Sequence, residues 1–346
     1  MEWADFRSDT VTPPTPEMRA AMAQAEVGDD VFGEDPTVQR LEELAAERVG
    51  MGAALFVASG TMGNLAAVLT HCQRGDEIIL GDRSHTYLHE AGGVSALGGV
   101  HPHTVRNQSD GTLDPQEIIG AIRAVDDHFP TSRLIILENT HNHSGGTPLS
   151  FEYVQQVGSL AREHGLRLHI DGARIFNAAI ALGKPAAELA APADSISFCL
   201  SKGLCAPVGS LLCGSAEFIR LARRTRKQLG GGMRQAGILA AAGIVALESM
   251  VDRLAEDHQR ARQLATGLRE IHGIQVEQEP QTNMVYFRLD PQGGVTTQDL
   301  VQALASRSIR LTARNPHRMR MVVHYWIDDA AVERAVEGIA GAMAVP

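Results

Sequence analysis

The sequence is poor in cysteine and in aromatic residues, and it contains no long apolar run. Its four cysteines are scattered without CxxC spacing, which in a chain of 346 residues without a secretory signal predicts reduced thiols. No stretch approaches the roughly 18 apolar residues that a membrane-spanning helix needs. Aromatic residues make up only 4% of the chain against 34 glycines, which favours close-packed helices and backbone-lined sites over an aromatic-rich β-sandwich.

Positive charge is also in deficit. The chain carries 31 basic and 41 acidic residues, a net charge of −10, without any block of like charge. Such a diffuse acidic surface argues against nucleic acid or an anionic membrane as a partner. The first residues, MEWADFRSDTVT, lack a positively charged segment followed by an apolar run, so no signal peptide is predicted and we expect a cytoplasmic protein.

Several common catalytic signatures are absent. There is no GxGxxG after a strand, no GxxxxGK[ST] and no GxSxG, so the usual anchors of dehydrogenases, P-loop enzymes and α/β-hydrolases are missing. The histidine pairs at 101/103 and 141/143 lack a third ligand at suitable spacing. We therefore predict no metal site.

Short apolar segments bounded by turn residues alternate with amphipathic helical patterns through most of the chain. This alternation predicts an α/β fold with a mostly parallel sheet and helices on both faces. From about residue 236 an Ala/Leu-rich helical stretch leads into a smaller mixed unit. We predict a large α/β domain with an N-terminal arm, residues 1–247, and a small C-terminal α+β domain, residues 248–346.

The first segment that carries chemistry is Ser59-Gly60-Thr61, between a predicted strand at 53–58 and a predicted helix at 62–72. A turn of this kind directs free backbone N–H groups and the positive end of the helix dipole at an anion such as a phosphate. Alone it is a weak signal, because Ser-Gly-Thr turns also serve as helix N-caps.

Two further segments place charged groups directly after buried strands. LRLHIDGAR (166–174) ends in Asp171 and Arg174, which could face a pyridine nitrogen and hold a carboxylate. The alternative is a structural Asp–Arg pair. SISFCLSKG (195–203) ends in Lys202, whose amine suits a Schiff base in a sheltered pocket. The alternative is a surface lysine at a strand end.

A phosphate turn, an aspartate and a lysine in this order fit fold-type I enzymes that use pyridoxal 5′-phosphate (PLP), the aspartate aminotransferase-like superfamily. The chain also contains the segments RSDTVT (7–12), VGDDVFGEDPTV (27–38), SHTYLHEAGG (84–93), LENTHN (137–142), HIDGARIFNA (169–178), CLSKGLCAPVGSLLCG (199–214) and GGGMRQAGILAAAGI (230–244). Through these segments it resembles the low-specificity L-threonine aldolases in particular, from about residue 6 to its C-terminus and more strongly in the large domain.

The resemblance implies a role for each matching residue. Lys202 is expected to bind the cofactor as a Schiff base, Asp171 to face its pyridine nitrogen, and His85 to stack on its ring. The full cofactor set is expected to be Ser59, Gly60, Thr61, His85, Asp171, Arg174, Lys202, Lys227 and Arg234. The substrate set is expected to be Ser8, His85, His128, Arg174 and Arg320, with Ser8, Arg174 and Arg320 on the α-carboxylate.

Arg234, with help from Lys227, resembles a residue that reaches the phosphate of a neighbouring subunit. Without the resemblance, Arg234 would be read as a surface charge at a helix start. With it, the chain is expected to form a homotetramer, or at least a dimer, with shared active sites.

The expected reaction is cleavage of the Cα–Cβ bond of L-threonine or L-allo-threonine to glycine and acetaldehyde. His85 and His128 are both candidate bases for the β-hydroxyl proton, directly or through water. The sequence leaves open which diastereomer is preferred. Another fold-type I enzyme, such as an aminotransferase or a β-eliminating lyase, is the main alternative, and a non-catalytic relative of the fold is a further one.

Overall fold

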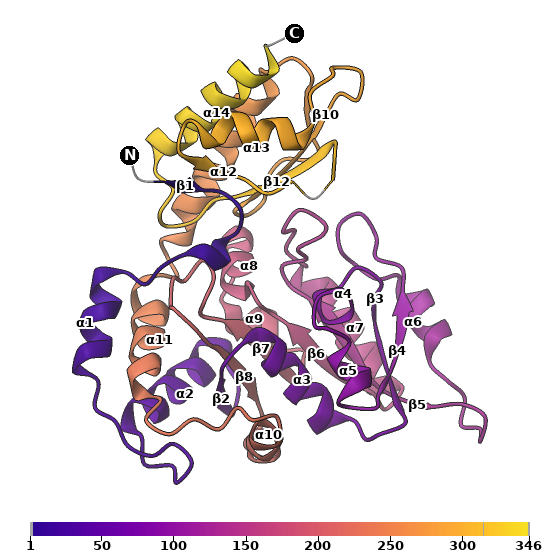
Figure 1. The fold of residues 1–346 in the computed structure, drawn as a ribbon. Coiled ribbons are helices and arrows are strands. Elements are labelled where there is room, and N and C mark those ends of the chain that lie inside the picture. The colour runs from indigo at the N-terminus through magenta and orange to yellow at the C-terminus, as the bar shows by residue number, and fades with distance from the viewer. Residues whose placement is uncertain (1–2, 314, 345–346) are drawn as a thin grey trace.

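The computed structural model describes residues 3–313 and 315–344, and its centre is a seven-stranded sheet (Figure 1). All strands but one run parallel; β8 is antiparallel to both of its neighbours. Across the sheet the order is β2 (Ala53–Val57), β8 (Ser210–Gly214), β7 (Ser195–Cys199), β6 (Arg167–Asp171), β5 (Thr131–Glu138), β3 (Asp76–Gly81) and β4 (His101–Val105).

The sheet is apolar on both faces because alternate side chains of each strand enter different cores. In β5, Ile135 and Leu137 join the main core, whereas Leu134 and Ile136 pack on the opposite face. The main core is closed by α2 (Pro36–Val49), α6 (Pro115–Ala121), α7 (Phe151–Glu163), α8 (Ile175–Leu182), α9 (Ala186–Ala190) and α11 (Gly237–Ser249). The opposite face is covered by α3 (Gly60–His71), α5 (Gly93–Ala96) and α10 (Ala216–Gln228).

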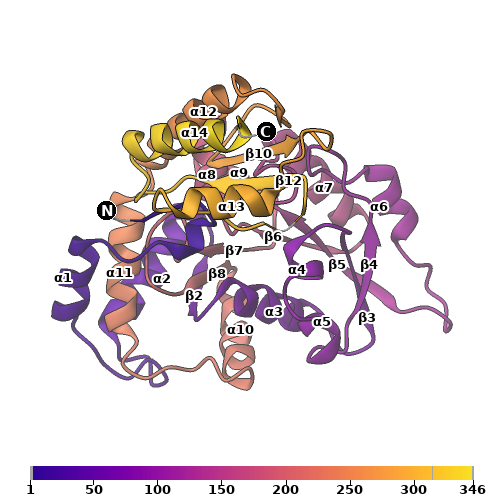
Figure 2. The same ribbon diagram turned by 45° about the horizontal axis from the view of Figure 1, so that its top comes forward.

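A second, smaller unit lies at one end of the large sheet (Figures 1 and 2). It contains the antiparallel sheet β9 (Ile274–Val276), β10 (Met284–Leu289) and β12 (Arg318–Val322), with helices α12 (Leu254–Arg269), α13 (Thr297–Ala305) and α14 (Asp329–Met343). Its core is separate from the large one.

The N-terminal arm belongs by packing to this smaller unit. Its strand β1 (Ala4–Asp5) pairs with β11 (Ile309–Arg310), and Phe6 is fully buried in the small core. The chain then passes through a short 3-10 helix, Asp9–Val11, and α1 (Pro16–Gln24) into the large unit. The arm therefore carries residues 7–9 past the junction of the two units.

The predicted fold class is confirmed: a mainly parallel sheet flanked by helices, followed by a small α+β unit. The helical stretch predicted after residue 236 is two helices, α11 and α12. α11 packs on the large core and most of α12 on the small one, while the boundary at residue 247 stays a prediction. Within the described ranges, no helix has the length and apolar character needed to cross a bilayer.

Candidate active site

The residues predicted to carry chemistry gather at one edge of the large sheet. Asp171 closes β6, Lys202 follows β7, and α3 begins just after β2. Because these three strands are parallel, their C-terminal ends meet at the same edge, which is where open α/β sheets bind ligands. The strand order therefore brings together three motifs that are far apart in the sequence.

The predicted phosphate turn is the start of α3. Ser59 is the N-cap, and its hydroxyl accepts a hydrogen bond from the N–H of Met62. The N–H groups of Gly60 and Thr61 precede the first intrahelical hydrogen bonds and remain available for an anion. A Cβ on Gly60 would lie 2.8 Å from Cys199 Sγ at the end of β7, so this start of the helix requires glycine.

Asp171 is buried and held from two sides. Its Oδ2 accepts a hydrogen bond from Asn64 Nδ2 at 2.8 Å, and its Oδ1 accepts one from the N–H of Ala173 at 3.2 Å. The same Asn64 amide group donates to Glu90 Oε1 at 2.8 Å. Two carboxylates thus share one amide at the predicted position of the pyridine nitrogen.

His85 begins the short helix α4 (His85–Leu88), and both its ring and its backbone are held by carboxylates. His85 Nδ1 lies 2.9 Å from Glu90 Oε1, and the His85 N–H donates to Glu138 Oε2 at 2.7 Å. The hydrogen bond to Glu90 raises the pKa of His85 against the opposing effect of burial. Burial raises the pKa of Glu138 to about 7, with Asp171 adding to the rise.

Arg174 and Asp9 form a buried ion pair beside this cluster. Arg174 Nε and one Nη donate to the two oxygens of Asp9 at 2.7 and 2.6 Å. Burial opposes the charge on Asp9, but Arg174, together with Lys202 and Arg320, holds the pKa of Asp9 well below its usual range. This pair matches the structural alternative for Arg174, while its second Nη remains for a ligand.

The other two predicted carboxylate-binding residues lie next to this pair. Ser8 directly precedes Asp9 and caps the 3-10 helix. Arg320, on β12, donates to Asn142 Oδ1 at 2.9 Å and to the carbonyl of Arg7 at 3.1 Å. Arg320 also lines a cavity of about 220 Å³ between the loop at 142–143 and strands β10 and β12. The arm, the large unit and the small unit therefore each contribute one predicted group.

Lys202 is half-buried, and its backbone is tied to the N-terminal arm because Thr12 Oγ1 donates to the Lys202 carbonyl at 2.9 Å. Its ammonium charge acts on both Asp9 and His85. The lysine therefore lies between the predicted carboxylate-binding groups and the His85–Asp171 cluster.

His128 does not join the site of its own chain. It lies in an exposed loop before β5, with Nδ1 2.6 Å from Asp126 Oδ1. The site is at the other end of β5, which at about 3.3 Å per residue is roughly 25 Å away. The role predicted for His128 can therefore apply only to the site of another subunit.

Arg234 and Lys227 also face outward from their own chain. Arg234 pairs with Asp29 at 2.8 Å and its guanidinium lies 5.9 Å from the ring centre of Phe32, which is 73% exposed. Lys227 is exposed in the last turn of α10. Their predicted role at a neighbouring phosphate stays a prediction.

Four residues of the cluster were not singled out from the sequence: Asp9, Asn64, Glu90 and Glu138. Asp9, Glu90 and Glu138 lie inside the segments RSDT, HEAGG and LENTHN. An acidic residue at the end of an apolar strand, such as Glu138, is a signal that sequence reasoning could have used, because buried carboxylates need dedicated partners.

His85, Glu90 and Asp171 are close enough to hold a metal ion, and they are the one such group in the described ranges. The Asn64 amide nitrogen, however, already donates to both carboxylates. A cation would have to displace that donor, so the arrangement suits a hydrogen-bonded organic group better.

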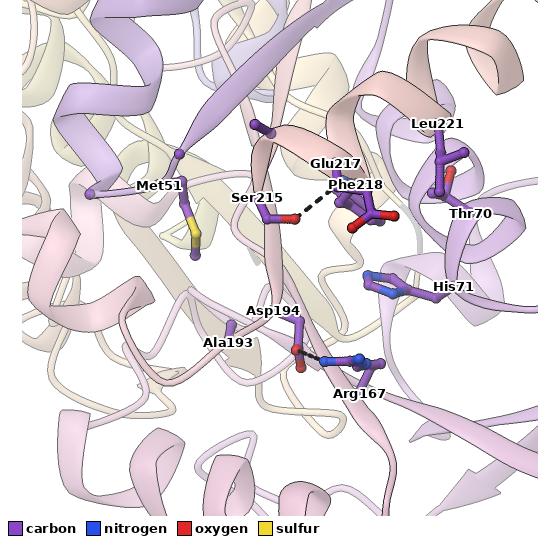
Figure 3. A pocket seen from close by; sticks show the side chains of 13 residues that line it. Met51, Thr70, His71, Arg167, Ala193, Asp194, Ser215, Glu217, Phe218 and Leu221 are labelled. Atoms are coloured by element: carbon purple, nitrogen blue, oxygen red, sulfur yellow. Dashed lines mark hydrogen bonds and ion pairs between the residues drawn. The ribbon is translucent and has the colours of Figure 1, made fainter.

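A larger pocket, of about 770 Å³, lies at the opposite edge of the sheet (Figure 3). Its wall includes His71, Arg167 and Asp194, which lie at the end of α3 and at the N-terminal ends of β6 and β7. None of the predicted site residues lines it.

Comparison with known proteins agrees with this geometry. Residues 5–290 match the beta-eliminating lyase family. Over 336 residues the chain is 51% identical to low-specificity L-threonine aldolase 1 of Arabidopsis thaliana, covering 96% of this chain and 94% of that protein. Over 299 residues it is 47% identical to the low specificity L-threonine aldolase of Escherichia coli (strain K12), covering 86% and 88%.

The chain belongs to the beta-eliminating lyase family, among the low-specificity L-threonine aldolases. A threonine aldolase structure from Leishmania major has the same fold, with a TM-score of 0.83 at 20% identity, covering 99% of this chain and all of that one. The predicted resemblance is thereby confirmed.

Enzymes of this family and fold use PLP, and the residues at this edge fit that group. The start of α3 offers free N–H groups to a phosphate, and Asp171 offers a carboxylate to a ring nitrogen. Glu90 Oε2 is buried without a hydrogen-bond partner, as expected where a ligand completes a polar cluster. Lys202, just after β7, is the residue expected to hold the cofactor carbonyl.

Proposed function

We propose that this protein cleaves L-threonine and L-allo-threonine to glycine and acetaldehyde with PLP as cofactor. The observation that carries the proposal is the convergence, at one sheet edge, of Lys202, the His85–Asp171 cluster and the carboxylate-binding group. The names of its full-length relatives support the same reaction.

The chain's own residues provide three separate functions for this reaction. Bound PLP would supply an electron sink, which the Asp171 carboxylate keeps effective by facing a protonated ring nitrogen. Arg320, Ser8 and the second Nη of Arg174 would bind the α-carboxylate and so orient the Cα–Cβ bond. These groups come from the two units and the arm, so the substrate would bind at their junction.

His85 is the base candidate that the single chain provides. Glu90 Oε1 accepts from Nδ1 of its ring, which leaves Nε2 to take the proton of the β-hydroxyl group. The bond between Cα and Cβ then breaks, acetaldehyde departs, and a proton returned to Cα completes glycine. His128 would contribute only across a subunit interface.

The oligomer is part of the proposal. Arg234 contacts the exposed ring of Phe32 on the surface of one chain. Two further exposed apolar residues are near these in the sequence, Val31 beside Phe32 and Ile238 four residues after Arg234. A second subunit that covered these residues would place its phosphate turn near Arg234 and Lys227 of the first. We therefore propose a homotetramer, or at least a dimer, in the cytoplasm.

The first experiment is an acetaldehyde assay of the purified protein with PLP, using L-threonine, L-allo-threonine and D-threonine. We expect aldehyde from the two L-isomers only. Ammonia or a keto acid instead of aldehyde would identify a β-eliminating lyase or an aminotransferase. Lys202→Ala should lose nearly all turnover, with Lys184→Ala in the turn between α8 and α9 as the matched control; full activity of the Lys202 variant would refute the proposal.

A further inference from the structure

A line of five polar side chains runs along the large sheet, from the N-terminal ends of its strands to their C-terminal ends. It begins at His71 in the wall of the pocket shown in Figure 3 and ends at Asp171 in the proposed cofactor site. The successive contacts are His71 Nε2 to Ser195 Oγ at 2.8 Å, Ser195 Oγ to His169 Nδ1 at 2.9 Å, His169 Nε2 to Asn64 Oδ1 at 3.2 Å, and Asn64 Nδ2 to Asp171 Oδ2 at 2.8 Å. No step of the proposed reaction uses the first four residues.

The orientation of the line is set at Asn64. Its amide nitrogen, which can only donate, gives hydrogen bonds to Asp171 Oδ2 and Glu90 Oε1, both at 2.8 Å. Its Oδ1 therefore points the other way, where it accepts from Ser197 Oγ at 2.6 Å and meets His169 Nε2. The two carboxylates thus decide which end of the amide faces which neighbour.

This orientation determines the tautomer of His169. An amide oxygen can only accept, so the proton of the His169 ring must be on Nε2. Burial lowers the pKa of His169 to about 3, so the ring is neutral and its Nδ1 is an acceptor. The single proton of the Ser195 hydroxyl then points to His169.

The same reasoning extends to the outer end of the line. Since Ser195 donates its proton inward, its oxygen accepts from the Nε2–H of His71. Burial lowers the pKa of His71 to about 4, so this ring is neutral as well. Every donor in the line consequently points toward Asp171.

We propose that His169 and Asn64 are positioning residues, which fix the orientation in which the Asp171 carboxylate faces the cofactor ring nitrogen. The inference rests on the proposed cofactor. Asp171 is 3% exposed, and the Asn64 amide nitrogen that donates to it also donates to the neighbouring Glu90 carboxylate. Because His169 and Ser197 hold the other end of that amide, they fix the direction from which Asn64 holds Asp171 Oδ2.

The test compares His169→Leu with His169→Gln in the holoenzyme. The glutamine amide can still donate to Asn64 Oδ1, whereas leucine cannot. The probe is PLP labelled with ¹⁵N in its ring, whose ¹⁵N chemical shift in solid-state NMR reports protonation of that nitrogen. His258→Gln is the matched control, since His258 is also buried but bonds to Asn177 outside the line.

We expect the leucine variant to move the ¹⁵N signal toward the unprotonated position and to raise the PLP dissociation constant roughly tenfold, the usual scale for a lost buried hydrogen bond. The glutamine variant should keep both close to wild type, as should the control. A leucine variant with lowered melting temperature but unchanged ¹⁵N signal and PLP affinity would mean a purely structural role and overturn the inference.

If the leucine variant does not fold, Asn64→Ala tests the same line. The substitution removes the amide that donates to Asp171 without adding a charge, so the same two readouts should change in the same direction; unchanged values would overturn the inference. A wild-type protein that does not bind PLP overturns both proposals. One that binds PLP without releasing acetaldehyde contradicts only the reaction, because the ¹⁵N readout does not depend on turnover.

Discussion

Asp9 is a completely buried carboxylate whose charge is balanced by Arg174. Removing one partner of such a pair leaves an uncompensated buried charge, so Asp9→Asn should lower the free energy of unfolding by about 3 kcal/mol at pH 7. Asp329→Asn, which alters the exposed pair with Arg260, should change it by only about 0.5 kcal/mol. Urea denaturation at fixed protein concentration measures both.

The difference in the free energy of unfolding between wild type and Asp9→Asn should depend on pH. The pKa of Asp9 is lower in the folded than in the unfolded chain, so its stabilisation is complete above the unfolded value of about 4. It is lost as the pH falls from there through the folded pKa. The gap between wild type and Asp9→Asn should therefore narrow below about pH 4; a gap independent of pH would contradict the charge-based explanation.

Arg320 makes a contrasting prediction, because its effect should be on the substrate rather than on stability. Arg320→Ala should raise KM for L-threonine about 10- to 100-fold, with a smaller change in kcat, as a charge-assisted hydrogen bond to the α-carboxylate is lost. Arg288→Ala, on the neighbouring strand β10 and paired with Glu277, is the control. Steady-state kinetics would speak against the carboxylate role if both variants had wild-type KM.

At the scale of elements, the start of α3 is defined by its close approach to β7. Gly60→Ala would put a Cβ 2.8 Å from Cys199 Sγ and shift the N–H groups that are expected to hold the phosphate. We expect PLP affinity to fall at least tenfold. Gly120→Ala, in α6 with open space around it, should leave PLP affinity unchanged and stabilise the protein slightly. Titration of the apoprotein with PLP distinguishes them.

The loop at 141–147 of the large unit is hydrogen-bonded to the small unit. Gln278 donates to the Ser144 carbonyl, Thr282 to the Gly146 carbonyl and Tyr286 to the Asn142 carbonyl. Asn142 and His143 in this loop line the cavity beside Arg320.

At the scale of the whole molecule, the outward-facing Arg234 predicts complementation between subunits. If each site combines Lys202 of one chain with Arg234 of another, a mixture of Lys202→Ala and Arg234→Ala chains forms hybrids that contain one intact site. Refolding the two inactive variants together should then restore up to about a quarter to a half of the activity at limiting PLP. Activity no higher than the sum of the separate variants would show that Arg234 serves no neighbouring site.

Most of the fold was predictable because it depends on local pattern. Continuous apolar strands such as β5, with amphipathic helices between them, imply a parallel sheet covered on both faces, and strand-end residues such as Asp171 and Lys202 must then share an edge. The partners of these residues were not predictable in the same way. Asn64 reads as an ordinary residue of a helix, and only the packing of α3 against β6 and β7 gives it two carboxylates and a histidine as neighbours.

The sequence by itself determined the order of the elements, the family and the motif residues at strand ends, because short-range periodicity and contiguous segments encode them. Tertiary structure alone decided that Arg174 spends its main hydrogen bonds on Asp9, that His128 lies at the far end of β5, and that a buried line of donors converges on Asp171. These facts depend on which distant side chains meet, and on how far burial shifts their protonation, which no local pattern specifies.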